Sequence, residues 1–132
     1  MKKEQLIQKA VEASTRSYSP YSKFPVGAAL VTKDGKVYQG CNIENASFGL
    51  TNCAERSCMF NAYSDGVRKQ DIVALALYSP KEYMVAPCGA CRQVMVELLD
   101  ENCPIYIAYG NNQCVETTVK ELVPYMFSSK EL

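Results

Sequence analysis

One segment constrains the fold more than any other: the run Asp71–Ser79, DIVALALYS, is almost wholly apolar and shows no alternation. A strand with one face in water alternates apolar and polar residues, whereas a strand covered on both faces does not. The run is therefore expected to be a central strand. Other elements must then cover both of its faces, which indicates helices packed against a sheet.

The rest of the chain supplies those helices and the remaining strands. Apolar residues recur at helical spacing in three segments, and two β-rich runs flank Asp34-Gly35, a dipeptide preferred in tight hairpin turns. The expected helices cover about residues 3–17, 53–65 and 86–102, with Pro87 at the start of the third. Two further strands are expected in 103–110 and 111–118, followed by a short helix that Pro124 breaks.

This order predicts an α/β fold, a three-layer α-β-α sandwich around one mixed sheet of about five strands. The chain has 132 residues, 48% of them hydrophobic, which suffices for the core of one domain spanning residues 1–132. No apolar run approaches the length of a membrane span, and the N-terminal segment lacks the apolar stretch of a signal peptide. We therefore expect a cytoplasmic protein that does not contact a membrane.

Composition also restricts the chemistry. The 14 basic and 14 acidic side chains cancel and are scattered, so polymeric nucleic acid is not an expected partner. The chain has no histidine, which excludes a Ser-His-Asp triad, a Cys-His dyad and imidazole metal ligands. It has seven cysteines, and clustered cysteines in a cytosolic protein indicate metal binding or catalysis rather than disulfides.

Two short motifs combine thiols with a carboxylate. Cys53-Ala54-Glu55 and Pro87-Cys88-Gly89-Ala90-Cys91 each fall at the expected start of a helix, where the first-turn amides favour ionised thiolates. Three thiolates leave a tetrahedral zinc ion one open position, as in catalytic sites. We therefore expect one Zn²⁺ on Cys53, Cys88 and Cys91, with Glu55 as the catalytic group.

The alternative is a structural zinc site with a fourth cysteine, or thiols that are simply buried. Cys41, Cys58 or Cys103 would complete a four-cysteine site. Glu55 argues against that interpretation, because a structural site has no use for a second buried negative charge beside its thiolates. The catalytic interpretation leaves Cys41, Cys58, Cys103 and Cys114 to packing or exposure.

A carboxylate motif joined with P-C-x-x-C is the signature of zinc nucleobase deaminases, in which three cysteines sometimes hold the metal. Beyond this motif, the chain closely resembles the short, homotetrameric cytidine deaminases from end to end. The resemblance is carried by YSPYSKFPVGAALVTKDGKVYQGCNIENASFG, NCAERS, APCGACRQVMVEL and ELVPYMFSS. It implies hydrolysis of cytidine and 2'-deoxycytidine to uridine and 2'-deoxyuridine with release of ammonia, in pyrimidine salvage.

The resemblance also implies roles around the metal. Glu55 would carry protons from water to N3 of the pyrimidine and to the departing ammonia. The backbone N–H of Ala54 would contact the base carbonyl, and the carbonyl of Ala86 is a weaker candidate for steering ammonia. Arg56 would donate hydrogen bonds to ligand thiolates and return positive charge to a zinc centre that three thiolates make negative.

Substrate contacts follow from the same resemblance. Asn42 and Glu44 match a pair that binds the ribose 3'-hydroxyl, and Phe24 matches an aromatic that packs on the nucleoside. Phe127 is expected to reach into a neighbouring subunit's pocket, so that sites are shared within a homotetramer. Phe48 stands where some relatives carry tyrosine, so a hydroxyl contact is lost there.

Two other functions remain open at this point. One is deamination of another amino-pyrimidine, as in antibiotic-type deaminases that share the Cys-Ala-Glu and Pro-Cys core. The FPVGAA and NIEN segments argue against it. The other is a zinc-stabilised interaction module, which would hold its metal through four cysteines and hydrolyse nothing.

Overall fold

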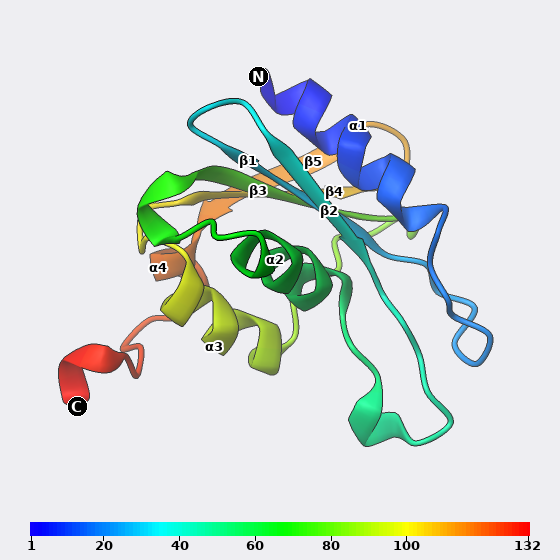
Figure 1. Cartoon of the computed structure of the whole chain (residues 1–132). Helices are drawn as coiled ribbons and strands as arrows, with labels where there is room; N and C mark the ends of the chain where they lie inside the picture. Colours follow the sequence, from blue (N-terminus) through cyan, green and yellow to red (C-terminus); the bar gives the residue numbers. More distant parts are fainter.

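A computed structural model describes all of residues 1–132 and shows four helices and five strands with three short 3-10 turns (Figure 1). The helices are α1 (Lys3–Ser14), α2 (Ala54–Ser64), α3 (Gly89–Leu98) and α4 (Val119–Leu122). The strands are β1 (Gly27–Thr32), β2 (Val37–Cys41), β3 (Ile72–Ser79), β4 (Pro104–Tyr109) and β5 (Gln113–Thr118). The 3-10 turns η1, η2 and η3 cover Phe48–Leu50, Lys69–Asp71 and Ser129–Glu131.

The strands form one mixed sheet in the order β2-β1-β3-β4-β5. Strand β3 lies at its centre, as the apolar run predicts. It pairs antiparallel with β1 and parallel with β4, and α3 lies in the connection between the two parallel strands. The hairpin at Asp34-Gly35 is also confirmed, with β1 and β2 antiparallel and Gly35 at a φ of 86°.

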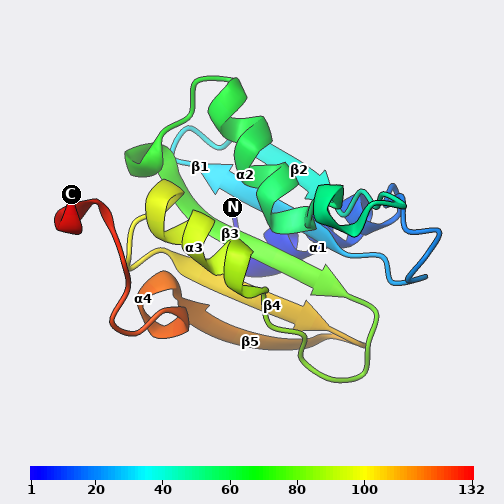
Figure 2. The same cartoon turned by 90° about the horizontal axis from the view of Figure 1, so that it is seen from below.

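Helices cover both faces of the sheet, which confirms the α/β architecture. Figure 2 shows α2 and α3 side by side across one face, whereas α1 lies behind the other. Alternation along β3 divides its side chains between the two layers. Leu75 and Leu77 pack with α2 and α3 in the larger core cluster, and Ala74 and Ala76 pack with α1 in the smaller one. None of the helices combines the length and apolar character that crossing a membrane would require.

Helix α1 ends at Ser14, three residues before the end expected at Ser17. No glycine or proline lies between Ser14 and Pro20, so the local sequence does not mark this end and tertiary contacts set it. Tyr18 forms a β-bridge with Ile43, and its N–H donates to the Asn42 carbonyl at 3.0 Å. The chain must become extended before Tyr18, so the helix stops early.

Helix α3 is also shorter than expected. Cys88 is its N-cap, with extended backbone, so Pro87 lies before the cap rather than in the first turn. The helix ends at Leu98, because Leu99 is extended and Asp100 starts a turn that accepts the N–H groups of Asn102 and Cys103. The prediction of a helix over 86–102 was therefore wrong at both ends.

Gly40 of β2 lets the sheet approach helix α2, whose start carries Cys53. A Cβ at Gly40 would lie 2.3 Å from the backbone nitrogen of Cys58 and 2.8 Å from the carbonyl oxygen of Ala54. Gly40→Ala is therefore expected to lower the free energy of unfolding by about 3 kcal/mol, measured by urea denaturation. Gly49→Ala is the control, because nothing lies within 4 Å of a Cβ there. Equal effects of the two changes would contradict this packing argument.

Candidate active site

The starts of α2 and α3 bring the two cysteine motifs together. Cys53 is the N-cap of α2, and Cys88 is the N-cap of α3. Both cap residues are extended, so each thiol lies at a helix N-terminus, where unpaired backbone N–H groups favour negative charge. Cys91 lies one turn into α3, and its backbone N–H donates to the Cys88 sulfur at 3.5 Å.

The sulfur atoms of Cys53, Cys88 and Cys91 all lie within 4.8 Å of one another. The Sγ atoms of Cys53 and Cys88 are 3.8 Å apart. Two sulfurs on a tetrahedral zinc ion, each at about 2.3 Å, would be separated by about 3.8 Å. The three thiols therefore fit Zn²⁺, as predicted from the motif spacing.

No fourth cysteine joins this cluster, which is the only group of side chains placed to share a metal ion. Cys58 is fully buried, and its thiol donates to the Tyr38 carbonyl at 3.3 Å. The Cys41 thiol donates to the Arg16 carbonyl at 3.4 Å. Cys103 is buried in the core, and desolvation raises the pKa of its thiol to about 12. The four-cysteine alternative is therefore excluded by position.

Positive charge lies directly beside the thiols. The Arg56 guanidinium donates from Nη2 to the Cys53 sulfur at 3.4 Å. A hydrogen bond from Cys91 and those from Arg56 and Cys88 lower the pKa of Cys53 to about 5, and the same pairing with Cys53 raises the pKa of Cys91. These hydrogen bonds thus favour the ionised form of the Cys53 thiol.

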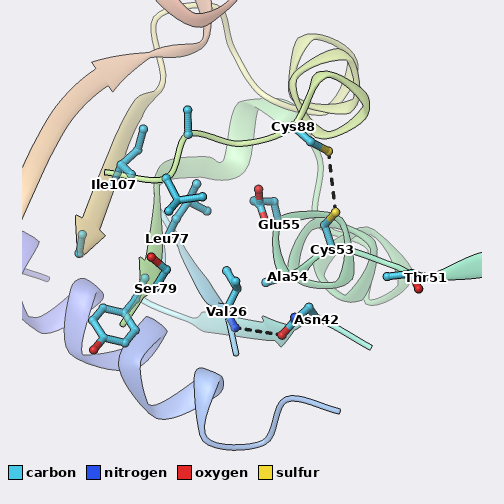
Figure 3. A pocket seen from close by; sticks show the side chains of 14 residues that line it. Val26, Asn42, Thr51, Cys53, Ala54, Glu55, Leu77, Ser79, Cys88 and Ile107 are labelled. Carbon is cyan, nitrogen blue, oxygen red and sulfur yellow. Dashed lines mark hydrogen bonds between the residues drawn. The ribbon is translucent and has the colours of Figure 1, made fainter. Parts of the chain in front are cut away.

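Glu55 and two of the thiols line the same cavity, about 200 Å³ in volume, between the sheet and the starts of α2 and α3. Figure 3 shows Glu55 beside Cys53 and close to Leu77. Glu55 is 6% exposed, and burial is the largest of the effects that raise its pKa to about 7. The cavity lies at the carboxyl ends of the parallel pair β3–β4, where ligand sites form in open α/β sheets.

Of the two expected sugar-binding residues, Asn42 lines the cavity and Glu44 does not. The Asn42 amide donates to the Phe24 carbonyl at 2.8 Å and accepts the Val26 N–H at 2.9 Å. Glu44 accepts the N–H groups of Tyr21 and Ser22 at 3.0 and 3.1 Å, and also the Ser22 hydroxyl. Both side chains are thus held by the 17–26 loop.

Other expected contact residues do not line this cavity. Phe24 is half-buried, and Lys81 Nζ lies 4.9 Å from the centre of its ring. Phe127 is 60% exposed and Phe48 is 82% exposed, and neither lines the cavity of this subunit. The Phe127 carbonyl accepts the Gln93 side-chain amide at 2.9 Å, which ties this segment to α3.

Sequence reasoning missed the apolar wall of the cavity. The motifs predict Cys53, Ala54, Glu55, Cys88 and, more weakly, Ala86, all of which line it. The continuous apolar character of β3 conceals which of its residues face the site, so alternation gives no signal there. The missed residues are Val26, Thr51, Leu77, Tyr78, Ser79, Val85, Ile107 and Ala108.

Comparisons with known proteins agree with this geometry. The family model of the cytidine and deoxycytidylate deaminase zinc-binding region matches residues 1–107. The chain is 48% identical to the cytidine deaminase of Halalkalibacterium halodurans over 132 residues, covering 100% of this chain and 98% of that protein. It is 49% identical to the cytidine deaminase of Sporosarcina psychrophila over 129 residues, covering 98% and 93% of the two proteins.

A crystal structure shows the same fold. The cytidine deaminase from Burkholderia pseudomallei superimposes with a TM-score of 0.93 and 45% identity, covering 96% of this chain and 100% of that one. The segment matched by the family model contains all three clustered cysteines and Glu55. From its sequence, its sheet and its zinc-binding region, the chain belongs to the cytidine deaminase family.

Proposed function

We propose that the protein is a zinc-dependent hydrolase that deaminates cytidine and 2'-deoxycytidine to uridine and 2'-deoxyuridine, releasing ammonia. The observation that carries this proposal is the cluster of three thiols, two of which line the same cavity as the buried Glu55. A structural zinc site has no need of such a carboxylate. The seven cysteines are all free, which is consistent with a protein of the reducing cytoplasm. The reaction would serve pyrimidine salvage.

The proposed chemistry divides between the metal and the chain. Zn²⁺, when bound, polarises a water molecule as a Lewis acid. Glu55 would accept a proton from the attacking water and deliver it to N3 of the base as the water oxygen bonds to C4. It would then take the second proton from the new C4 hydroxyl and pass it to the amino group, which leaves as ammonia when the C4–N bond breaks. The Ala54 N–H at the start of α2 would donate to the base carbonyl, and the Ala86 carbonyl is the weaker candidate for accepting a hydrogen bond from ammonia.

The sugar is proposed to bind at the entrance. Asn42 retains one amide hydrogen after its bond to Phe24, and Glu44 retains acceptor capacity on its carboxylate. A hydroxyl both accepts and donates, so the ribose 3'-hydroxyl matches this pair. Phe24 would pack against the nucleoside from the same loop.

The direct test of function is the loss of cytidine absorbance as uridine forms, with zinc content measured in the same preparation. Turnover of cytidine and deoxycytidine with stoichiometric ammonia is the expected result. A zinc-loaded protein that leaves both nucleosides unchanged would overturn the proposal. An antibiotic-type amino-pyrimidine, tried in parallel, would then identify the other deaminase activity.

Arg56 is proposed to compensate the thiolate charge. Arg56→Gln is expected to lower kcat/KM about tenfold at full zinc occupancy, because more negative charge at the centre weakens its action on water. Steady-state kinetics and zinc analysis measure both quantities. Arg68→Gln is the control, since Arg68 is exposed and bonds only to the carbonyls of Tyr63 and Val67 through its side chain. Equal rates for both variants would assign Arg56 a merely structural role.

We further propose a homotetramer in which Phe127 completes a neighbouring subunit's pocket. Large apolar side chains are exposed both at η1 and near the C-terminus, including Phe48, Leu50 and Phe127. Both segments project on the side of the sheet that carries α2 and α3 (Figure 1). A second copy placed there would cover these side chains.

Mixed oligomers test this sharing. Glu55→Gln chains and Phe127→Ala chains that assemble at random would place native Glu55 and native Phe127 in roughly a quarter of the sites. Activity at low cytidine should therefore exceed the mean of the two parents. If hybrid oligomers, verified by mass, show only that mean, Phe127 does not serve a neighbouring site.

A further inference from the structure

Three serine and threonine residues are buried, namely Ser14, Thr32 and Ser79, and one of them has a hydroxyl without a partner. The Ser14 hydroxyl donates to the Val11 carbonyl at 2.6 Å. The Thr32 hydroxyl accepts the Lys36 N–H at 3.2 Å. Ser79 Oγ forms no hydrogen bond within the protein. Burying a hydroxyl without a partner loses its hydrogen bonds to water without compensation, so Ser79 requires an explanation.

Ser79 lies in the wall of the candidate active site. It is the last residue of β3, two residues after Leu77, and alternation therefore directs both side chains to the α2–α3 face. Ser79 is 4% exposed and lines the same cavity as Glu55 and Cys53. Figure 3 shows it beyond Leu77, away from the two labelled thiols.

No residue of the surrounding wall forms a hydrogen bond with this hydroxyl. Leu77, Ile107, Val85 and Val26 contribute only carbon side chains to the cavity. The polar side chains of the wall, among them Asn42, Thr51 and Glu55, form no hydrogen bond with it either. A partner for Ser79 must therefore come from what the cavity holds.

The proposed function indicates which part of a bound nucleoside would lie next to Ser79. In a bound cytidine, C4 lies toward the thiols and Glu55, the base carbonyl lies toward the Ala54 N–H, and the sugar lies toward Asn42. The C5–C6 edge is then the side of the ring left to face the strand wall. That edge of cytidine has no hydrogen-bonding atom, but a polar substituent on C5 would supply one.

We propose that Ser79 is a specificity-determining residue, whose hydroxyl hydrogen-bonds a polar substituent on C5 of a bound pyrimidine nucleoside. This inference rests on the proposed function, because it uses that orientation of the ring. It assigns the protein a further substrate class: cytidines with a hydrogen-bonding group at C5, preferred over those with an apolar group of similar size.

The test measures 5-hydroxymethylcytidine and 5-methylcytidine as competitors of cytidine deamination. In the native protein, the hydroxymethyl compound is expected to have the lower inhibition constant. In Ser79→Ala that preference should fall about tenfold, because the hydroxymethyl group on C5 loses its buried hydrogen-bond partner. Ser14→Ala is the matched control: it removes a buried hydroxyl that is already bonded, away from the cavity, and should leave the preference unchanged.

Thermal unfolding supplies a second readout. Ser79→Ala removes an unpartnered group and should leave the Tm unchanged or raised, whereas Ser14→Ala loses a formed bond and should lower it. An unchanged preference in Ser79→Ala overturns the inference, and so does a failure of both compounds to compete. Absence of cytidine turnover by the native protein would instead overturn the proposed function, so the two failures are distinguishable.

Discussion

Replacing Glu55 by glutamine is expected to lower kcat for cytidine about 10³-fold while one zinc ion per chain remains bound. Glutamine keeps the size and hydrogen-bonding shape of the side chain, but it cannot take up and return a proton. Zinc should remain because Glu55 is not one of the three clustered ligands. Initial rates from the absorbance change, together with elemental analysis of the purified variant, measure both parts of this expectation.

The control for this change is Glu97→Gln, an equal loss of charge on the exposed side of α3. Its rate should match that of the native protein. If Glu55→Gln retained a rate within tenfold of native, another group would have to carry the protons. The absence of histidine leaves few candidates, and Glu55 is the only acidic residue in the cavity wall.

Alanine in place of Cys53, Cys88 or Cys91 is expected to abolish both zinc binding and activity. Two thiolates give a weaker site than three, and the metal should be lost to a mild chelator during gel filtration. The measurement is the ratio of zinc to protein, followed by the cytidine assay. Activity should fall at least as far as in Glu55→Gln, because the polarising ion is absent.

Two buried cysteines provide matched controls. Cys58→Ala and Cys103→Ala each remove a buried thiol, so they should cost stability, but both thiols lie outside the cluster. One zinc ion per chain and native activity are expected in each. Zinc loss from Cys58→Ala at a native fold would favour a four-cysteine site, against the positions described above.

Local patterns predict a large part of this molecule. The apolar run of β3, the hairpin at Asp34-Gly35 and the two cysteine motifs each depend on residues close together in the chain. A cysteine at the start of a helix is placed by that helix, so predicting two helix starts also predicts that Cys53 and Cys88 can converge. The parallel pairing of β3 and β4, which α3 connects, then brings these two cysteines side by side.

Features that depend on distant contacts could not be predicted. Helix α1 ends at Ser14 because the chain must be extended where Tyr18 pairs with Ile43, and no local signal marks that pairing. Ser79 ends an apolar strand, and only the assembled sheet shows that this residue lines the cavity. The role of Phe127 depends on surfaces outside a single chain, so it stays a prediction.

The sulfur cluster joins residues that are 35 positions apart, since Cys53 begins α2 and Cys88 begins α3. A metal ion across that gap acts on the unfolded chain as a covalent cross-link does, because it closes a loop that contains all of β3. By the relation used for disulfides, closing a loop of this length removes conformational entropy worth about 4 kcal/mol at 25 °C. The ion that supports the reaction therefore also cross-links the two helices whose starts border the cavity. Removal of the metal should lower the free energy of unfolding as well as stop turnover.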